Sequence, residues 1–234
     1  MKTVILAGGF GTRLSEETKL KPKPMVEIGG KPILWHIMKI FSNFGFNDFV
    51  ICCGYKGEVI KEFFKNVEES WSIDLVDTGL DTMTGGRIRR VEKLLENQRF
   101  FLTYGDDLKS VNISDLLQFH INQKKLVTLT SAQPPGRFGI LEMDGNNVIN
   151  LTEKPPGDGN WINGGYYVLE PQIFDYIHDD SNIWENDVLP QLIQKNQVSA
   201  YKYHGKYQPM DTINDKEKLQ QMWISNDAYW KVWK

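Results

Sequence analysis

A glycine-rich loop directly after the first apolar segment is the feature that most limits how this chain can fold. Four apolar residues at 4–7 lead into glycine at positions 8, 9 and 11, which is typical of a buried strand followed by a tight turn. Because glycine has no Cβ, backbone N–H groups in such a turn can approach a phosphate chain closely. Arg13 and Lys23 add positive charge nearby, and the prolines on either side of Lys23 restrict its backbone. The segment therefore predicts a turn that holds phosphate groups.

The composition is that of a globular protein without a surface for nucleic acid. Hydrophobic residues make up 41% of the 234 residues and aromatic residues 12%, which is enough for a large core. A formal net charge of −3 argues against a nucleic-acid partner, since such partners usually need a basic surface. No apolar run approaches the ~20 residues that span a bilayer, and the first residues lack the pattern of a signal peptide. We therefore expect a cytoplasmic protein with no membrane partner.

Strand and helix patterns alternate along the first half of the chain. Apolar runs predict strands, and segments with helical periodicity predict the helices between them. Cys52 and Cys53 fall in the second strand and are interpreted as small core residues. This order predicts an α/β fold, with a Rossmann-like, doubly wound and mostly parallel sheet that carries helices on both faces. The predicted strands are 3–7, 49–53, 73–76, 100–103 and 126–131, and the predicted helices are 32–44, 58–64, 87–95 and 113–123.

The second half has a different pattern, with short strands separated by turn signals. We interpret its strands as antiparallel additions that complete a mixed sheet and close a substrate cleft. No repeat or low-complexity linker divides the chain, so a single domain over 1–234 is expected, with parts at about 1–132, 133–212 and 213–234. The predicted strands are 138–143, 148–152, 164–169 and 201–203, with a turn at 144–147 and helices at 171–177, 188–195 and 215–224.

The C-terminal segment is rich in aromatic residues. Trp223, Tyr229, Trp230 and Trp233 fit either docking onto the core or a subunit interface, since aromatic side chains serve both. We expect a homo-oligomer that associates through this segment.

Two common classes of glycine loop do not match this sequence. The P-loop spacing of Gly-x4-Gly-Lys-Ser/Thr is missing, and the dinucleotide fingerprint lacks its third glycine. A nicotinamide-dependent oxidoreductase would also need an acidic residue at the end of the second strand, where this chain has Gly54 and Tyr55. The four histidines show no metal-ligand spacing, and no Ser or Cys lies in a nucleophile elbow. These observations favour an enzyme that holds a nucleoside triphosphate without a covalent nucleophile.

A longer stretch of the N-terminal segment resembles the signature of the sugar-1-phosphate nucleotidylyltransferases. The similar residues are Leu6-Ala7-Gly8-Gly9-Phe10-Gly11-Thr12-Arg13-Leu14, followed by Pro22-Lys23-Pro24-Met25. Residues 22–38, 51–57 and 208–212 are similar to the branch of that family that uses CTP and glucose 1-phosphate. The resemblance covers nearly the whole chain and implies the fold of nucleotide-diphospho-sugar transferases. It implies a reaction of a nucleoside triphosphate with a sugar 1-phosphate that gives an NDP-sugar and pyrophosphate.

Two separated aspartates are the candidate metal ligands. Asp106 follows the predicted strand 100–103 at its carboxyl end, where open α/β sheets bind ligands. Asp211 lies much further along the chain, and the residues alone do not pair it with Asp106. The resemblance does pair them, because the metal aspartates of the family occupy matching motifs, and it implies Mg²⁺ as the cofactor. Asp107 stands where we expect glycine in the closest relatives, and we interpret its side chain as facing solvent.

The resemblance also implies a sugar-phosphate site in the second half of the chain. Glu153 and Asn163 would hydrogen-bond the sugar hydroxyls, and Lys154 would hold the sugar phosphate. The backbone at Gly164 would let the sugar ring approach closely.

The nucleotide site lies, by the same resemblance, in the first half. Arg13 would neutralise the pyrophosphate, Lys23 would lie near the α-phosphate or the sugar phosphate, and both would act in catalysis together with the two aspartates. Glycines at 85 and 86 open a predicted helix whose N-terminus suits an anion. The expected nucleotide-binding residues are Leu6, Ala7, Gly8, Gly9, Gly11, Thr12, Arg13, Lys23, Thr84, Arg87 and Gly105.

Alternatives to this function remain open at the level of the sequence. Another base (uracil, thymine or guanine) or another sugar would use the same chemistry, and the stretch from Phe64 to Thr84 is shorter than we expect in the branch that uses CTP. A non-catalytic protein that binds nucleotide sugars for regulation is a further class. The presence of the full set favours an enzyme, because a sensor has no need of a metal pair; the set is Arg13, Lys23, Asp106, Lys154 and Asp211.

Overall fold

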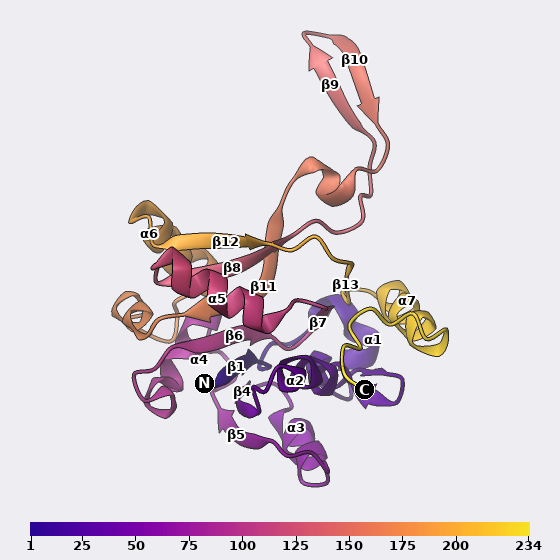
Figure 1. The fold of residues 1–234 in the computed structure, drawn as a ribbon. Coiled ribbons are helices and arrows are strands. Elements are labelled where there is room, and N and C mark those ends of the chain that lie inside the picture. The colour runs from indigo at the N-terminus through magenta and orange to yellow at the C-terminus, as the bar shows by residue number, and fades with distance from the viewer.

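The computed structural model describes the backbone of residues 1–234 and every side chain except those of Arg13, Ser15, Glu16 and Asp107. Its centre is a seven-stranded sheet (Figure 1). The spatial order is β12 (Val198–Lys202), β8 (Val127–Ala132), β11 (Ile162–Leu169), β6 (Phe100–Tyr104), β1 (Thr3–Leu6), β4 (Asp48–Cys53) and β5 (Ser72–Asp77). All neighbours pair in parallel except β11, which is antiparallel to both β6 and β8. The predicted mixed, mostly parallel sheet is confirmed, but β12, the strand predicted at 201–203 as an antiparallel addition, instead pairs in parallel with β8.

Helices cover both faces of the sheet because successive residues of a buried strand point to opposite sides. Within β1, Ile5 packs into one apolar cluster, whereas Val4 and Leu6 pack into the other. The Ile5 cluster includes residues from α2 (Ile33–Asn43), α3 (Gly57–Phe64), α5 (Ile113–Gln123) and α7 (Ile213–Ile224). The Val4 cluster includes residues from α4 (Thr84–Arg90) and α6 (Leu189–Gln194). This double layer is the predicted doubly wound arrangement.

The predicted helix at 113–123 has the expected bounds, and Asn112 caps it by accepting hydrogen bonds from two backbone N–H groups. The helix predicted at 87–95 instead begins at Thr84 and ends at Arg90, with a 3₁₀ turn at Glu92–Leu95. Its first turn packs closely on a neighbouring loop, since a Cβ on Gly85 would lie 2.7 Å from the Asn182 carbonyl oxygen. Glycine therefore serves backbone packing here, which the pattern of apolar residues does not report.

The second half departs most from prediction at the hairpin of β9 (Ile140–Asp144) and β10 (Asn147–Thr152). The predicted turn between these strands is present, but the hairpin forms its own two-stranded sheet and projects away from the body (Figure 1). The prediction that it completes the main sheet is therefore wrong. Alternation of apolar and polar residues predicts a strand but not its partner. We call residues 140–152 the arm.

Two further short strand pairs and one short helix lie at the sheet's rim. These are β2 (Glu27–Ile28) with β3 (Lys31–Pro32), β7 (Asp107–Lys109) with β13 (Tyr207–Pro209), and α1 (Ser15–Thr18). Shorter turns of 3₁₀ helix include Lys23–Met25 and Pro171–Tyr176, the second of which was predicted as an α-helix at 171–177. Among the described residues, no helix has the length and apolar character needed to cross a membrane.

The C-terminal aromatic residues dock onto the body. Trp230 is fully buried, and its indole N–H faces Nδ1 of the buried His36 at 3.4 Å. Trp223 lies directly over Gly29, where a Cβ would come within 2.1 Å of the indole nitrogen. Of the two interpretations of this segment, core docking is the one these contacts show.

Candidate active site

A cavity of about 480 Å³ opens beside the carboxyl ends of β1 and β6, the position where open α/β sheets bind ligands. The glycine loop forms one wall, and the loop before α4 forms the other. Nine of the residues predicted to bind nucleotide lie on its walls: Leu6, Ala7, Gly8, Gly9, Gly11, Thr12, Lys23, Thr84 and Arg87. The lining residues that sequence reasoning missed are Phe10, Pro24, Leu80, Asp81, Thr82, Met83 and Tyr104.

The glycine loop needs glycine at two positions for reasons visible in the packing. A Cβ on Gly8 would lie 2.2 Å from a guanidinium nitrogen of Arg87. Gly11 has φ +64°, in the left-handed region that favours glycine, and a Cβ there would lie 3.0 Å from Cβ of Lys23. The loop therefore packs tightly on two cationic side chains. Gly105, the remaining predicted nucleotide-binding residue with a described position, donates its N–H to the Leu6 carbonyl at 3.0 Å.

The Arg87 guanidinium is nearly buried and connects three segments of the cavity wall. Its Nη1 donates to Oγ1 of Thr78 at 2.7 Å, to the Gly79 carbonyl at 2.7 Å and to the Cys53 carbonyl at 3.3 Å. Its Nη2 donates to the Leu80 carbonyl at 3.2 Å. Four donated hydrogen bonds hold the loop that lines the cavity against the end of β4. In this structure Arg87 therefore shapes the cavity wall.

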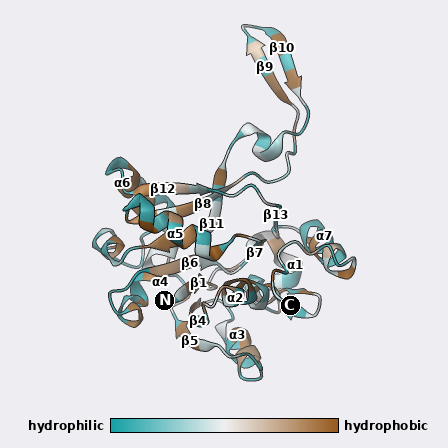
Figure 2. Cartoon of the chain, in the orientation of Figure 1, coloured by the Kyte–Doolittle hydropathy of each residue, from teal (hydrophilic) through white to brown (hydrophobic). Residues whose placement is uncertain are grey.

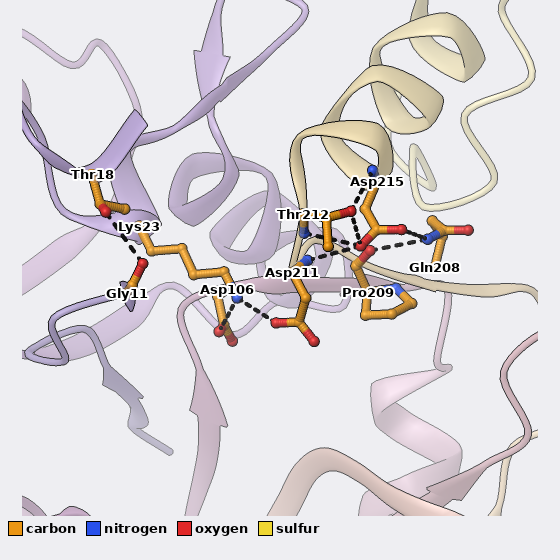
Figure 3. Close-up of polar contacts among 9 residues, drawn as sticks. All are labelled: Gly11, Thr18, Lys23, Asp106, Gln208, Pro209, Asp211, Thr212 and Asp215. Atoms are coloured by element: carbon orange, nitrogen blue, oxygen red, sulfur yellow. Dashed lines mark hydrogen bonds and ion pairs between the residues drawn. The ribbon is translucent and has the colours of Figure 1, made fainter. Parts of the chain in front are cut away.

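Lys23 brings Asp106 and Asp211 together at the edge of the cavity (Figure 3). Its ammonium donates to Asp106 at 2.9 Å and to Asp211 at 2.8 Å, and its side chain is only 8% exposed. Burial disfavours the charged ammonium, but the adjacent carboxylates of Asp106 and Asp211 outweigh this and raise the pKa of Lys23 above its usual value. The ammonium is therefore charged at neutral pH, and the two aspartates share it.

Asp211 is positioned by the start of α7, and Figure 3 shows this arrangement. Thr212 and Asp215 form a capping box, and the Asp215 carboxylate also accepts from the backbone N–H of Asp211 at 3.2 Å. Gln208 donates to the other oxygen of Asp215 at 2.9 Å. Sequence reasoning missed Asp215, although Thr212 followed three residues later by an acidic residue at a helix start is a recognisable signal.

The donor set at Asp106 and Asp211 fits a divalent metal ion. Both carboxylates contact the same atom, Nζ of Lys23, so a single metal ion placed between them can also contact both. Mg²⁺ favours one or two carboxylates combined with phosphate oxygens and water. Within the described side chains, no cluster of three or more His, Cys, Asp or Glu residues offers a complete protein cage for a metal. The predictions for Arg13 and for a solvent-facing Asp107 lie outside the described side chains.

The predicted sugar-phosphate residues do not all meet this cavity. Glu153 and Lys154, just after the arm, are 67% and 62% exposed, and they form an ion pair with each other at 3.5 Å. Neither lines the cavity. Gly164 is buried in β11, where a Cβ would lie 2.7 Å from Oγ1 of Thr130. The structure thus brings the predicted nucleotide and metal residues together but leaves Glu153 and Lys154 outside the cavity.

Asn163 is linked to the nucleotide cavity by a chain of side-chain hydrogen bonds. Its amide donates to the Tyr167 hydroxyl, which lies 3.2 Å from the hydroxyl of Tyr104. Tyr104, on the cavity wall, donates to Glu185, which also accepts from Oγ1 of Thr84 at 2.8 Å. Burial raises the pKa of Tyr167 to about 12 and also raises that of Tyr104, so both stay protonated and able to donate. The sequence gives no signal for this contact between distant segments.

The fold and the site together define a nucleotide-handling α/β protein, and comparison with known proteins assigns its family. The model of the nucleotidyl transferase family matches residues 2–231. The chain therefore belongs to the nucleotidyl transferase family, as its motifs predicted.

Individual members of the family are similar to this chain over its whole length. Glucose-1-phosphate cytidylyltransferase of Salmonella typhi is 48% identical over an alignment of 256 positions, gaps included, which covers 100% of both chains. A probable glucose-1-phosphate cytidylyltransferase of Bacillus subtilis is 38% identical over 255 residues, again covering 100% of both. Among solved structures, HddC from Yersinia pseudotuberculosis is similar with a TM-score of 0.74 and 26% identity, over 95% of this chain and 99% of that chain.

Proposed function

We propose that this chain transfers a cytidylyl group from CTP to α-D-glucose 1-phosphate, giving CDP-glucose and pyrophosphate. The observation that carries this proposal is the meeting of Lys23, Asp106 and Asp211 at the edge of the glycine-walled cavity. The choice of CTP and glucose 1-phosphate is supported by the full-length similarity to glucose-1-phosphate cytidylyltransferases.

The nucleoside triphosphate would lie in the cavity between the glycine loop and the loop before α4. The glycine loop offers backbone N–H groups to the phosphates, and Gly9 has open space where a side chain would otherwise stand. Residues 80–84 would face the base, held in place by the hydrogen bonds of Arg87. Arg13 is proposed to neutralise the leaving pyrophosphate.

Asp106 and Asp211 are proposed to hold Mg²⁺. When bound, the ion would neutralise charge on the triphosphate and favour the departure of pyrophosphate. The capping box at Thr212 and Asp215 fixes the backbone of Asp211, so this ligand is oriented before substrate arrives.

The chain's own residues would then act mainly by positioning. An oxygen of the sugar 1-phosphate attacks the α-phosphorus, a new P–O bond forms, and the bond to the β-phosphate oxygen breaks with pyrophosphate as the leaving group. The nucleophile is already an anion, so no strong base is required. Lys23 would contact the α-phosphate or the sugar phosphate, and Lys154 would orient the nucleophile.

The sugar is proposed to contact Glu153, Asn163 and the Gly164 backbone. Asn163 is already oriented by its hydrogen bonds to Tyr167 and to the Gly165 N–H. Glu153 and Lys154 would have to approach the cavity from the base of the arm.

A triphosphate substrate would place the protein in the cytoplasm.

We further propose that the chain is a homo-oligomer, and that it associates through the arm in place of the C-terminal segment, where Trp230 is buried against the body. Leu141 lies opposite Leu151, and Met143 lies opposite Val148, so these four side chains share one face of the hairpin. Each is 50–59% exposed. An antiparallel sheet with one apolar face normally packs that face on a core. Figure 2 shows hydrophobic residues in both strands of the arm, away from the rest of the body.

The second copy's arm suits this face better than another apolar surface of the chain. The four facing side chains carry no charge, so the complementary surface must also be apolar. The apolar hollow beside α2 and α3 contains Trp35 and Phe63, but its rim carries lysines and glutamates, which would lose solvation against the uncharged face of the arm. Two identical arms packed face to face about a two-fold axis bury apolar side chains against each other without this cost.

Light scattering over a concentration series tests this association. Met143→Glu and Leu151→Glu place charge on the apolar face and should shift the protein towards the monomer. Thr152→Glu places the same charge on the opposite face, where Thr152 pairs with the uncharged Ile140, and should leave the oligomer unchanged. A wild type that stays monomeric, or Met143→Glu and Leu151→Glu proteins that associate like the wild type, would refute association through the arm.

The proposed reaction is tested by pyrophosphate release with Mg²⁺, crossing five nucleoside triphosphates against glucose 1-phosphate and mannose 1-phosphate. Release should be fastest with CTP and glucose 1-phosphate. Preference for another pair would keep the mechanism and overturn the proposed substrates. No release from a folded protein that still binds CTP would instead favour a regulatory protein that binds nucleotide sugars.

A further inference from the structure

The Lys23 ammonium stands between the two carboxylates that are proposed to hold the metal. It donates to Asp106 at 2.9 Å and to Asp211 at 2.8 Å, and no other partner of this ammonium is seen among the described side chains. We propose that Lys23 is an internal counter-ion that keeps the carboxylate pair closed to metal until a nucleotide arrives. Metal and nucleotide would then bind cooperatively. This inference rests on the proposed function, since it concerns the same metal pair.

Competition between the ammonium and a metal ion follows from their shared ligands. Both need the oxygens of Asp106 and Asp211 that face each other across Lys23. A dication brought to these oxygens would be repelled by the ammonium between them, so Lys23 has to move before the ion can contact both carboxylates. The metal-free carboxylates are already neutralised in part, which removes much of the attraction that would otherwise draw a metal in.

The Lys23 ammonium can leave Asp106 and Asp211 only if another anion pairs with it. Its side chain is 8% exposed, and its backbone is held between Pro22 and Pro24 in a 3₁₀ turn. The same side chain lines the nucleotide cavity, so the flexible stem can carry the ammonium from the carboxylates into that space. In an empty cavity the ammonium would be left largely buried and without a counter-ion, which is costly. Triphosphate oxygens in the cavity would supply the missing anion.

Two consequences follow from this exchange of partners. Metal alone should bind weakly to the wild-type protein, and a bound nucleotide should strengthen metal binding because it accepts Lys23. By linkage, metal should strengthen nucleotide binding by the same factor. An uncharged side chain at position 23 should open the carboxylate pair to metal and remove the dependence on nucleotide.

The test measures Mn²⁺ binding to the nucleotide-free protein by electron paramagnetic resonance of the free ion. Lys23→Met should bind Mn²⁺ at least about tenfold more tightly than the wild type, a change of roughly 1.4 kcal/mol. Lys21→Met is the matched control, because it removes a nearby lysine that pairs with Glu27 instead. The control should bind Mn²⁺ like the wild type. Lys23→Gln serves in place of Lys23→Met if the methionine variant does not fold.

The outcomes separate this inference from the proposed function. Tighter binding in Lys23→Met that disappears when Asp106→Asn is added supports the counter-ion role. Equal Mn²⁺ affinity in the wild type and Lys23→Met would overturn the counter-ion role while leaving the metal pair intact. Absence of any Mn²⁺ site in both nucleotide-free proteins would overturn the counter-ion role, whereas the metal pair is tested separately by Mg²⁺-dependent pyrophosphate release in Asp106→Asn and Asp211→Asn.

Discussion

Replacing Arg87 by lysine tests whether this residue acts by shaping the cavity. The substitution keeps the positive charge on α4 but loses the planar group that donates to Thr78, Gly79, Leu80 and Cys53 together. A lysine ammonium is a single point of charge on a flexible stem and cannot reproduce this set. The loop from 78 to 82 should therefore be held less firmly against β4.

The magnitude follows from the hydrogen bonds that are lost. If two of the four bonds are not replaced, and each hydrogen bond to a charged group contributes about 1.5 kcal/mol, the ordered loop loses about 3 kcal/mol. Every 1.4 kcal/mol is a factor of ten, so the apparent affinity for nucleotide should fall by up to about 150-fold as the competent loop becomes less populated. The chemical groups at Lys23 and Asp106 are untouched, so kcat should change little.

Steady-state kinetics of pyrophosphate release, with CTP as the varied substrate, measure this split. We expect a raised KM for CTP with kcat within a few-fold of the wild type, together with faster amide hydrogen exchange in residues 78–82. Arg89→Lys on the same helix is the control, since Arg89 lies outside the cavity and should leave both parameters unchanged. A large fall in kcat with unchanged KM and unchanged exchange would refute the reasoning, because it would place Arg87 on the reacting groups.

Three further predictions concern the metal pair, the buried histidine and the C-terminal docking. Asp211→Asn should lower Mg²⁺-dependent pyrophosphate release by about a thousandfold or more while the circular dichroism spectrum stays native; near-normal release would remove Asp211 from the metal pair. Burial lowers the pKa of His36 in the folded chain to about 4, whereas the same imidazole in the unfolded chain has a pKa of about 6.5. Between these pH values the unfolded chain therefore binds a proton at His36 that the folded chain does not bind. Stability should therefore fall by about 3 kcal/mol as pH drops from 6.5 to 4, and urea unfolding of His36→Gln should lack this loss. Gly29→Ala should lower stability by about 3 kcal/mol, since Gly29 has φ +61° and a Cβ would collide with Trp223; an unchanged melting temperature would contradict the observed packing.

The sheet and the residues that line much of the candidate cavity could be predicted because they depend on local patterns. Apolar runs that end in glycine or aspartate place Gly8 and Asp106 after β1 and β6, and parallel strands bring such ends to one edge of a sheet. The pairing of Asp106 with Asp211 came instead from resemblance to a family. In the structure Asp106 and Asp211 lie close together because β13 pairs with β7. No local sequence pattern predicts this pairing.

The contacts that could not be predicted join segments far apart in the sequence. Tyr104 reaches Glu185 and Tyr167 only because β11 inserts antiparallel beside β6 and the turn before α6 packs over that edge. The hydrogen bonds of Arg87 depend in the same way on how α4 faces the end of β4. For the arm, the alternation of residues predicted the two strands correctly. Such a pattern does not indicate which surface the strands pack against.

Pyrophosphate release from CTP and glucose 1-phosphate, measured side by side for the wild type and Asp106→Asn, tests the central claim most directly. The account predicts release by the wild type that requires both substrates and Mg²⁺, and a loss of about a thousandfold or more in a folded Asp106→Asn protein. Equal release by the two proteins would contradict the assignment of the carboxylate pair. No release by a folded wild type with any of the tested substrate pairs would contradict the proposed reaction.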